Sequence, residues 1–209
     1  MKKPTIIILA GGIGKRFKPL ITNKLLFPFM GKAFLQHVIE MVEAAGGRDV
    51  ILVTSPETEN WLKSYHNPKL KIRSIIQPQA KGMGDALLKT KGLVDNEPIL
   101  IMNADDLIDT SFFAKLLETS VAADGFLVGK KVDDYYPAGY LEIKDQQVVA
   151  IVEKPGKEKM PSNYVNLVFH YLTKPKKFFD ILTKLPASDD QYEKAFSILL
   201  KNDRFGFIP

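Results

Sequence analysis

Residues 9–19, LAGGIGKRFKP, combine three glycines with several cations and contain no acidic residue. They follow an apolar run, TIIILA at 5–10, which predicts a β-strand buried on both faces. A glycine-rich turn after a strand exposes backbone N–H groups and forms a natural anion site. Arg16 adds a planar fork suited to a polyphosphate, and Lys24 adds a compact charge. The stretch therefore predicts a phosphate-binding loop.

Two widespread phosphate-binding motifs do not describe this loop. The dinucleotide pattern G-x-G-x-x-G matches Gly12 and Gly14 but requires glycine at Phe17, and the acidic ribose ligand expected further along is missing. The P-loop pattern G-x-x-x-x-G-K-[ST] requires glycine at Leu9 and Ser or Thr at Arg16. The remaining pattern is G-G-x-G-x-R, followed by a proline and a lysine.

A carboxylate follows another apolar strand, expected at 99–102. Asp105 is placed at the carboxyl end of this strand, where parallel sheets bind ligands. A lone carboxylate there suits a Mg²⁺ ion that also bridges phosphates and waters. Its neighbour Asp106 points elsewhere in an extended chain, and we expect it to cap a helix or lie in a solvated turn.

Composition excludes several classes of protein. The 209 residues are 45% hydrophobic and 25% charged, which is typical of one globular domain. The chain has no cysteine, so disulfides and thiolate metal sites are excluded. The net charge of +5 comes from scattered lysines, which disfavours nucleic-acid binding and fits a phosphate-rich small substrate. No apolar run approaches an export signal or the span of about 18 residues that crosses a membrane. We therefore expect a cytoplasmic protein without membrane or nucleic-acid partners.

The elements that must position these residues alternate in the first half of the chain. The predicted strands there are 5–10, 50–54, 72–76 and 99–102, and the helices are 32–45, 57–65, 84–93 and 110–122. This alternation predicts βαβ units and a mainly parallel sheet. In the second half we expect strands at 126–129 and 166–172, a hairpin of 139–143 with 148–153, helices 175–185 and 190–201, and a strand that begins at 205. The whole chain is predicted to be one α/β domain.

Five ordered segments resemble the signature of the sugar-1-phosphate nucleotidyltransferases. LAGGIGKRFKP with TNKLLFPFMGKA resembles the family's L-A-G-G-x-G-x-R-x-x-P and the T and P-K-x-x-x-P that follow. QPQAKGMGDAL, MNADDLI, VEKP and YVNLVFHYL resemble four later family segments in the correct order. The resemblance implies a Rossmann-like, three-layer α/β/α fold of the GT-A-like type with a mixed, mainly parallel central sheet. It also implies a nucleotide-binding half, 1–123, and a sugar-phosphate-binding half, 124–209.

The implied reaction joins a nucleoside triphosphate, UTP or dTTP favoured, to a sugar 1-phosphate and releases pyrophosphate, with Mg²⁺ as cofactor. The attacking phosphate is already anionic, so catalysis requires positioning and charge neutralisation rather than a general base. Accordingly, we interpret His37, His66 and His170 as structural. Two alternatives stay open: a regulatory homologue that binds the same ligands without turnover, and a cytidylyltransferase acting on a polyol phosphate. Homo-oligomerisation is also left open.

The same resemblance assigns the site residues. The implied catalytic residues are Arg16, Lys24 and Asp105, and Asp105 is also the implied metal ligand. The implied nucleotide-binding residues are Leu9, Ala10, Gly11, Gly12, Gly14, Lys15, Gln77, Gly82 and Asn103, of which Gln77 and Gly82 contact the base. The implied sugar-phosphate-binding residues are Gly139, Glu153, Lys154 and Asn166.

The chain also departs from the family pattern. Ala104 stands where glycine precedes the metal-binding Asp, and Leu167 and Val168 stand where a small residue and glycine are usual. The family's late D-x-G-T segment, which supplies a second metal-binding Asp, is not found. We therefore expect a C-terminally shortened form with Asp105 as its only firm protein ligand. Asp189 and Asp190 are interpreted as the N-terminal cap of the last helix.

Overall fold

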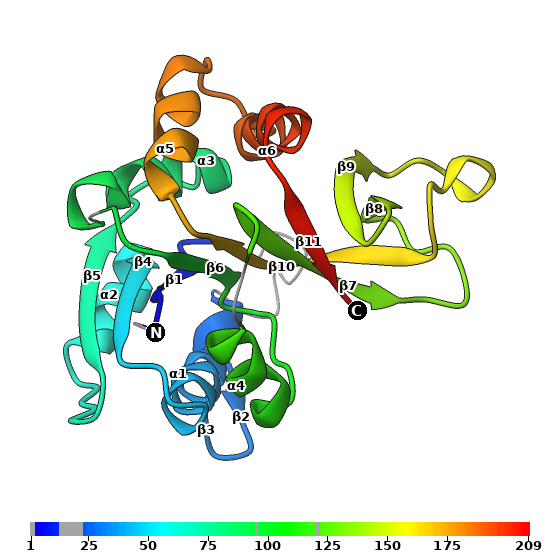
Figure 1. Ribbon diagram of the computed structural model, residues 1–209. Coiled ribbons are helices and arrows are strands. Elements are labelled where there is room, and N and C mark those ends of the chain that lie inside the picture. The colour runs from blue at the N-terminus through cyan, green and yellow to red at the C-terminus, as the bar shows by residue number, and fades with distance from the viewer. Residues whose placement is uncertain (1–2, 13–22, 95, 120–121) are drawn as a thin grey trace.

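The computed structural model describes residues 3–12, 23–94, 96–119 and 122–209. Nine strands in these ranges form one sheet in the order β5-β4-β1-β6-β10-β7-β11-β9-β8 (Figure 1). Their bounds in that order are Lys71–Ile76, Asp49–Thr54, Thr5–Ala10, Ile99–Asn103, Tyr164–Leu172, Gly125–Lys131, Phe205–Ile208, Gln147–Glu153 and Gly139–Lys144.

The sheet is mixed and mainly parallel, as predicted. Strands β5, β4, β1 and β6 are parallel neighbours, and β7 and β11 are also parallel to each other. Strand β10 lies antiparallel between β6 and β7, and β9 is antiparallel to both β8 and β11. Only β10 and β9 therefore run against β1 among the nine strands.

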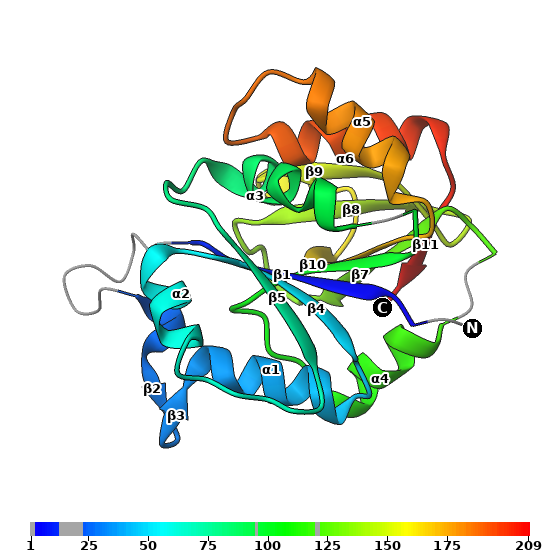
Figure 2. The same cartoon turned by 90° about the vertical axis from the view of Figure 1, so that its left-hand side faces the viewer.

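Helices cover both faces of the sheet and give three layers, which Figure 2 shows edge-on. Helices α1 (Phe34–Ala44), α2 (Pro56–Leu62) and α4 (Thr110–Glu118) contribute to the core on one side, and α3 (Gly82–Thr90), α5 (Pro175–Lys184) and α6 (Gln191–Asn202) to that on the other. The isoleucine run of β1 explains how one strand serves both cores. Ile6 and Ile8 belong to the first core and Ile7 to the second, because successive side chains of a strand point to opposite faces. The three-layer α/β/α prediction is confirmed.

Several predicted bounds are wrong by a few residues. The helix predicted at 57–65 ends at Leu62, and the helix predicted at 110–122 ends at Glu118. The helix predicted at 84–93 begins earlier, at Gly82, and its last turn is the 3₁₀ helix η3 (Lys91–Leu93). A small hairpin, β2 (Pro28–Phe29) with β3 (Lys32–Ala33), was not predicted, because two-residue strands are too short to show an alternating pattern.

The predicted cap of α6 is also corrected. Asp190 stands at the N-cap position but its side chain makes no capping hydrogen bond. Instead its Oδ1 accepts from the Ser188 hydroxyl at 2.6 Å and pairs with Lys194 Nζ at 2.9 Å. By contrast, Asp109 does cap α4, since its carboxylate accepts from the backbone N–H groups of two residues in the first turn. Among the described helices, none is both long and apolar enough to cross a bilayer.

Candidate functional site

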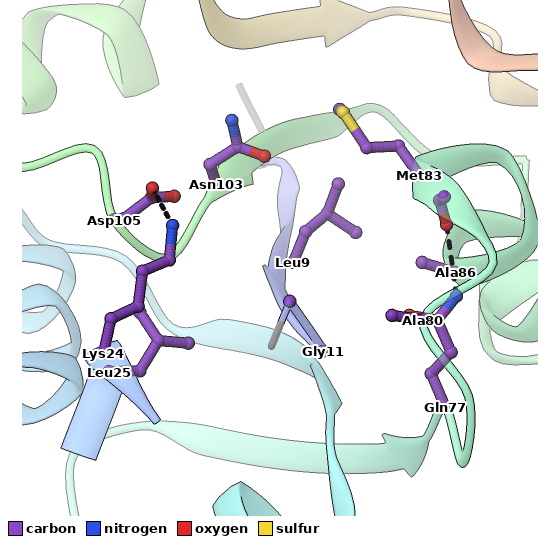
Figure 3. A pocket seen from close by; sticks show the side chains of 12 residues that line it. Leu9, Gly11, Lys24, Leu25, Gln77, Ala80, Met83, Ala86, Asn103 and Asp105 are labelled. Atoms are coloured by element: carbon purple, nitrogen blue, oxygen red, sulfur yellow. Dashed lines mark hydrogen bonds and ion pairs between the residues drawn. The ribbon is translucent and has the colours of Figure 1, made fainter. Parts of the chain in front are cut away.

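A pocket of about 300 Å³ opens at the carboxyl ends of β1 and β6 (Figure 3). Most of the residues predicted for the nucleotide side line it: Leu9, Gly11, Gly12, Lys24, Gln77, Gly82, Asn103 and Asp105. Leu25, Ala80, Met83 and Ala86 complete the lining. Ala10 is buried in the core beside it. The predicted residues Gly14, Lys15 and Arg16 lie outside the described residues.

The register of two neighbouring strands brings these residues together. Leu9 is the partner of Asn103 in the parallel ladder of β1 and β6, and the Ala104 N–H donates to the Leu9 carbonyl at 3.1 Å. Both strands therefore end at the same level, and the chain leaves β1 through Gly11 and β6 through Asp105. Ala104, where the family pattern has glycine, is fully buried. It does not line the pocket, whereas its neighbours Asn103 and Asp105 do.

Lys24 and Asp105 form an ion pair on one side of the pocket (Figure 3). Lys24 begins the 3₁₀ helix η2 (Lys24–Leu26), which is held in place by the buried Asn23. The Asn23 side chain accepts from the Leu25 N–H at 3.0 Å and donates to the Thr58 hydroxyl at 3.0 Å. Because both charged side chains remain partly exposed, a ligand can reach and separate them.

Two carboxylates at this point differ in their environment. Asp105 is exposed, whereas Asp106 is half-buried. Burial and the nearby charge of Asp105 together raise the pKa of Asp106 to about 6, although a hydrogen bond from the Asn103 side chain and the charge of Lys24 lower it. In the described ranges no group of three or more His, Cys, Asp or Glu side chains could hold a metal ion. One carboxylate with a second beside it fits Mg²⁺, which takes its other ligands from phosphates and water.

Gln77 forms the opposite end of the pocket, directly after β5. Its buried amide donates from Nε2 to the Gly82 carbonyl at 3.1 Å and to Asp85 Oδ2 at 2.7 Å. Its Oε1 lies against Gly11, where an added Cβ would approach that oxygen to 2.6 Å. Glycine at position 11 is therefore required for this close approach. Asp85 was not predicted from the sequence as part of this site.

The residues predicted for the sugar phosphate form a second group, outside the lining of this pocket. Gly139 and Glu153 are partners in the β8–β9 ladder, and an added Cβ at Gly139 would lie 2.5 Å from Glu153 Oε1. The carboxylate of Glu153 therefore lies over Gly139. Lys154 follows directly with a positive φ of 43°, and its N–H donates to the Ala138 carbonyl at 3.1 Å.

Strand β10 places Asn166 next to this pair and at the same sheet edge as the pocket. Tyr140 and Val165 are antiparallel partners, so Gly139 and Asn166 are adjacent across these two strands. On its other side, β10 pairs Phe169 with Met102 of β6. Because β10 runs against β6, Asn166 lies beyond the carboxyl end of β6, the end that carries Asn103 and Asp105.

A buried histidine contacts Asn166 and was not predicted as part of the site. His170 Nε2 lies 2.9 Å from Asn166 Oδ1, and its Nδ1 lies 2.5 Å from the Tyr192 hydroxyl on α6. Burial lowers the pKa of His170 to about 3, although a hydrogen bond with the Leu167 backbone acts in the opposite direction. The ring is therefore neutral at ordinary pH. Residues four apart on a regular strand lie about 13 Å apart, so the contact depends on the register shift between Leu167 and His170, which no sequence pattern indicated.

Helix α6 also places a second carboxylate near Glu153. Glu193 is half-buried, and its Oε2 is buried without a hydrogen-bond partner among the described residues. Burial raises the pKa of Glu193, and the nearby charge of Glu153 raises it further. The residues predicted to bind the sugar phosphate therefore have an additional carboxyl group beside them, on helix α6, which the sequence did not indicate.

Comparison with known proteins gives a consistent result. The family described as "Nucleotidyl transferase" matches residues 5–205. The chain is 32% identical over 187 residues to the Bifunctional protein GlmU of Methanococcus maripaludis strain C5, which covers 88% of this chain and 43% of that protein. It thus spans less than half the length of that relative. It is 29% identical to the UTP–glucose-1-phosphate uridylyltransferase of Streptococcus pyogenes, covering 95% of this chain and 79% of that protein.

Solved structures share the fold. A UDP-glucose pyrophosphorylase complexed with UDP-glucose superposes with a TM-score of 0.76 at 22% identity, over 99% of this chain and 90% of that one. A UDP-glucose pyrophosphorylase from Acinetobacter baumannii superposes with a TM-score of 0.79 at 19% identity, over 99% and 85%. At these identities the likeness concerns the arrangement of the strands and helices.

Proposed function

Because the chain belongs to the nucleotidyl transferase family, we propose that it joins a nucleoside triphosphate to a sugar 1-phosphate and releases pyrophosphate, with UTP or dTTP as the favoured nucleotide. The observation that carries the proposal is the pocket between β1 and β6. It brings Gly11, Gly12, Lys24 and Asp105 together from segments far apart in the chain. This set supplies backbone N–H groups, a cation and a carboxylate to one pocket.

The proposed chemistry needs no proton transfer. An anionic oxygen of the sugar phosphate attacks the α-phosphorus in line, and a new P–O bond forms as the bond to the β-phosphate oxygen breaks. Pyrophosphate leaves with the electron pair of that bond. The protein's contribution is to hold the two anions together, which Lys24 does by neutralising phosphate charge and the glycine backbone by donating hydrogen bonds. His170 is buried and lies outside the lining of this pocket, so it is not placed to act as a base there.

Asp105 would hold Mg²⁺ with its carboxylate, and Asp106 lies beside it. The ion supplies neutralisation of the phosphate charge when it is bound. The ion pair of Asp105 with Lys24 satisfies both groups before ligand arrives. Nucleotide offers phosphate oxygens to Lys24, which frees the Asp105 carboxylate for its own role.

The orientation of Gln77 supports a pyrimidine with an imide N–H. Its Nε2 is occupied by Gly82 and Asp85, so Oε1 is the part of the amide left to accept from a base. Uracil and thymine carry an imide N–H that can donate to such an oxygen. Cytosine can donate only from its exocyclic amine, which makes CTP the informative competitor.

The test is pyrophosphate release with UTP, dTTP, CTP, ATP or GTP, each combined with a panel of sugar 1-phosphates or a polyol phosphate in Mg²⁺. We expect turnover with UTP or dTTP and a sugar 1-phosphate. Turnover confined to CTP with the polyol phosphate would favour the cytidylyltransferase alternative. Stabilisation by nucleotide without turnover would favour a regulatory homologue, since a ligand at 100 times its Kd stabilises by about 2.7 kcal/mol.

A further inference from the structure

A chain of hydrogen bonds links the predicted sugar-phosphate side to helix α6. It runs from Asn166 Oδ1 to His170 Nε2 at 2.9 Å and from His170 Nδ1 to the Tyr192 hydroxyl at 2.5 Å. His170 is fully buried and Tyr192 nearly so. Their rings are stacked at a centroid distance of 5.7 Å, and Phe196 packs edge-on against the imidazole at 4.7 Å. The imidazole ring is therefore held rigidly on both sides.

The buried hydroxyl fixes the direction of both hydrogen bonds. In the described part of the chain, no group other than the His170 ring accepts from the Tyr192 hydroxyl. Because a buried donor without an acceptor lowers stability, the hydroxyl donates to Nδ1. The neutral ring then carries its single proton on Nε2, so this N–H donates to Oδ1 of Asn166 and is also the one ring donor that can serve the Leu167 backbone.

The amide of Asn166 keeps its NH₂ group for a ligand. This NH₂ makes no hydrogen bond to another described residue and is not among the buried groups that lack a partner, so it reaches solvent. It lies on the strand edge beside Gly139, over which the Glu153 carboxylate is placed. A rotation of the amide by 180° would bring NH₂ against the His170 N–H, so the ring excludes that orientation.

Resting on the proposed function, we infer that His170 is a positioning residue for the sugar phosphate: it fixes the Asn166 carboxamide so that only NH₂ faces an oxygen of that substrate. Tyr192 acts one step further back, because its hydroxyl selects the tautomer of the ring. The role concerns sugar-phosphate binding and leaves the nucleotide pocket untouched, since none of the three residues lines that pocket.

The kinetic test is a double-mutant cycle. His170→Phe keeps an aromatic ring but removes both nitrogens, so it should raise the KM for the sugar 1-phosphate about tenfold, the value of one oriented hydrogen bond. The KM for the nucleoside triphosphate should not change. Asn166→Ala should have a similar effect, and adding His170→Phe to it should change nothing more. Additive effects of the two substitutions would overturn the inference.

A matched control separates positioning from packing. Phe178→Leu thins the same aromatic cluster, in which Phe178 contacts Tyr192 at a centroid distance of 5.9 Å, but leaves both hydrogen bonds in place. It should leave both KM values unchanged while lowering thermal stability. A rise in the sugar-phosphate KM equal to that of His170→Phe would reduce His170 to a packing role and overturn the inference.

A second readout does not depend on turnover. The ¹⁵N shifts of the imidazole should show a proton on Nε2 and none on Nδ1 in the full chain at neutral pH. A proton on Nδ1 would overturn the inference even if the enzyme is active with a sugar 1-phosphate. Absence of turnover with every sugar 1-phosphate, despite the expected tautomer, would instead overturn the proposed function and with it the assignment of this donor to a sugar phosphate.

Discussion

The two halves of the sheet build their sites in different ways. On the side proposed to bind the nucleotide, β5, β4, β1 and β6 are parallel, and the pocket lies where neighbouring strands end at one level. On the side proposed to bind the sugar phosphate, β8 and β10 are antiparallel, as are β8 and β9, and Gly139, Glu153 and Asn166 come together through strand register. The first site therefore depends on residues at strand ends and in the segments that follow them, and the second on the register between antiparallel strands.

Substitution of the pocket carboxylate should have the largest effect and tests whether the nucleotide side carries the chemistry. Asp105→Asn should lower turnover by about 100-fold or more, because it removes a charge where phosphate charge must be neutralised. The fold should persist, since the side chain is 44% exposed. The measurement is kcat by pyrophosphate release, with circular dichroism as the check on folding. Asp106→Asn is the matched control and should be milder; equal losses in both variants would contradict the assignment of the metal to Asp105.

Acid should lower the free energy of unfolding through His170, which lies on the side proposed to bind the sugar phosphate. The pKa of His170 is about 3 in the folded chain against an ordinary value of 6.5, so the unfolded chain takes up the proton first as the pH falls. The contribution of neutral, buried His170 to the free energy of unfolding is fully present above pH 6.5. It is lost as the pH falls towards 3, at about 1.4 kcal/mol per pH unit. Urea unfolding of the wild type and of His170→Phe at several pH values should give a slope difference of this sign. Parallel curves would show that the ring is not buried as described.

The preference among nucleoside triphosphates should depend on Gln77 and not on the nearby Gln79. Gln77→Ala should reduce the preference for UTP or dTTP over CTP by about tenfold, because one oriented hydrogen bond is lost. The rate with the best nucleotide should fall less than this preference does. Gln79→Ala removes the same type of side chain from an exposed position two residues away and should leave the preference unchanged. A preference for ATP or GTP in the wild type would contradict the assignment of this end of the pocket to a pyrimidine.

The smallest expected effect concerns the ion pair of Lys24 with Asp105. Lys24→Met should tighten the binding of Mn²⁺ without nucleotide by about two- to fivefold, because Asp105 loses its competing cation. Turnover should fall in the same variant, since Lys24 also neutralises phosphate. Paramagnetic relaxation of water measures the first quantity. Lys32→Met breaks a comparable exposed pair with Glu40, remote from the pocket lining, and should not alter Mn²⁺ binding.

The nucleotide half of the fold was predicted from the sequence nearly completely. The alternation of apolar strands with helices fixed the parallel sheet, and the LAGG and NADD segments follow their strands directly, so their proximity required no knowledge of distant contacts. The bounds of β1 and β4 differ from the prediction by at most one residue, because buried strands are marked by continuous β-branched runs.

The sugar-phosphate half was predicted less completely, for a physical reason. The hairpin of β8 and β9 was recognisable, but the register that brings Gly139 to Asn166 is a contact between distant segments. The role of His170 was missed because an isolated histidine in an apolar strand is usually a core residue, and its partner Tyr192 lies 22 residues away on a helix. Asp85 was missed for a similar reason, since its partner Gln77 precedes the helix that carries it.

The irregularity within β10 has a consequence for how such a chain can evolve. Between Leu167 and His170 the pairing with β7 shifts, so that the strand holds residues at 168 and 169 that have no counterpart on β7. Bulges of this kind absorb changes in chain length and re-aim the side chains beside them. The pairing of Phe169 with Met102 lies on the opposite edge. Insertions or deletions at positions 167 and 168 would thus redirect Asn166 while β6 keeps its register, so the two neighbours of β10 can change independently of each other.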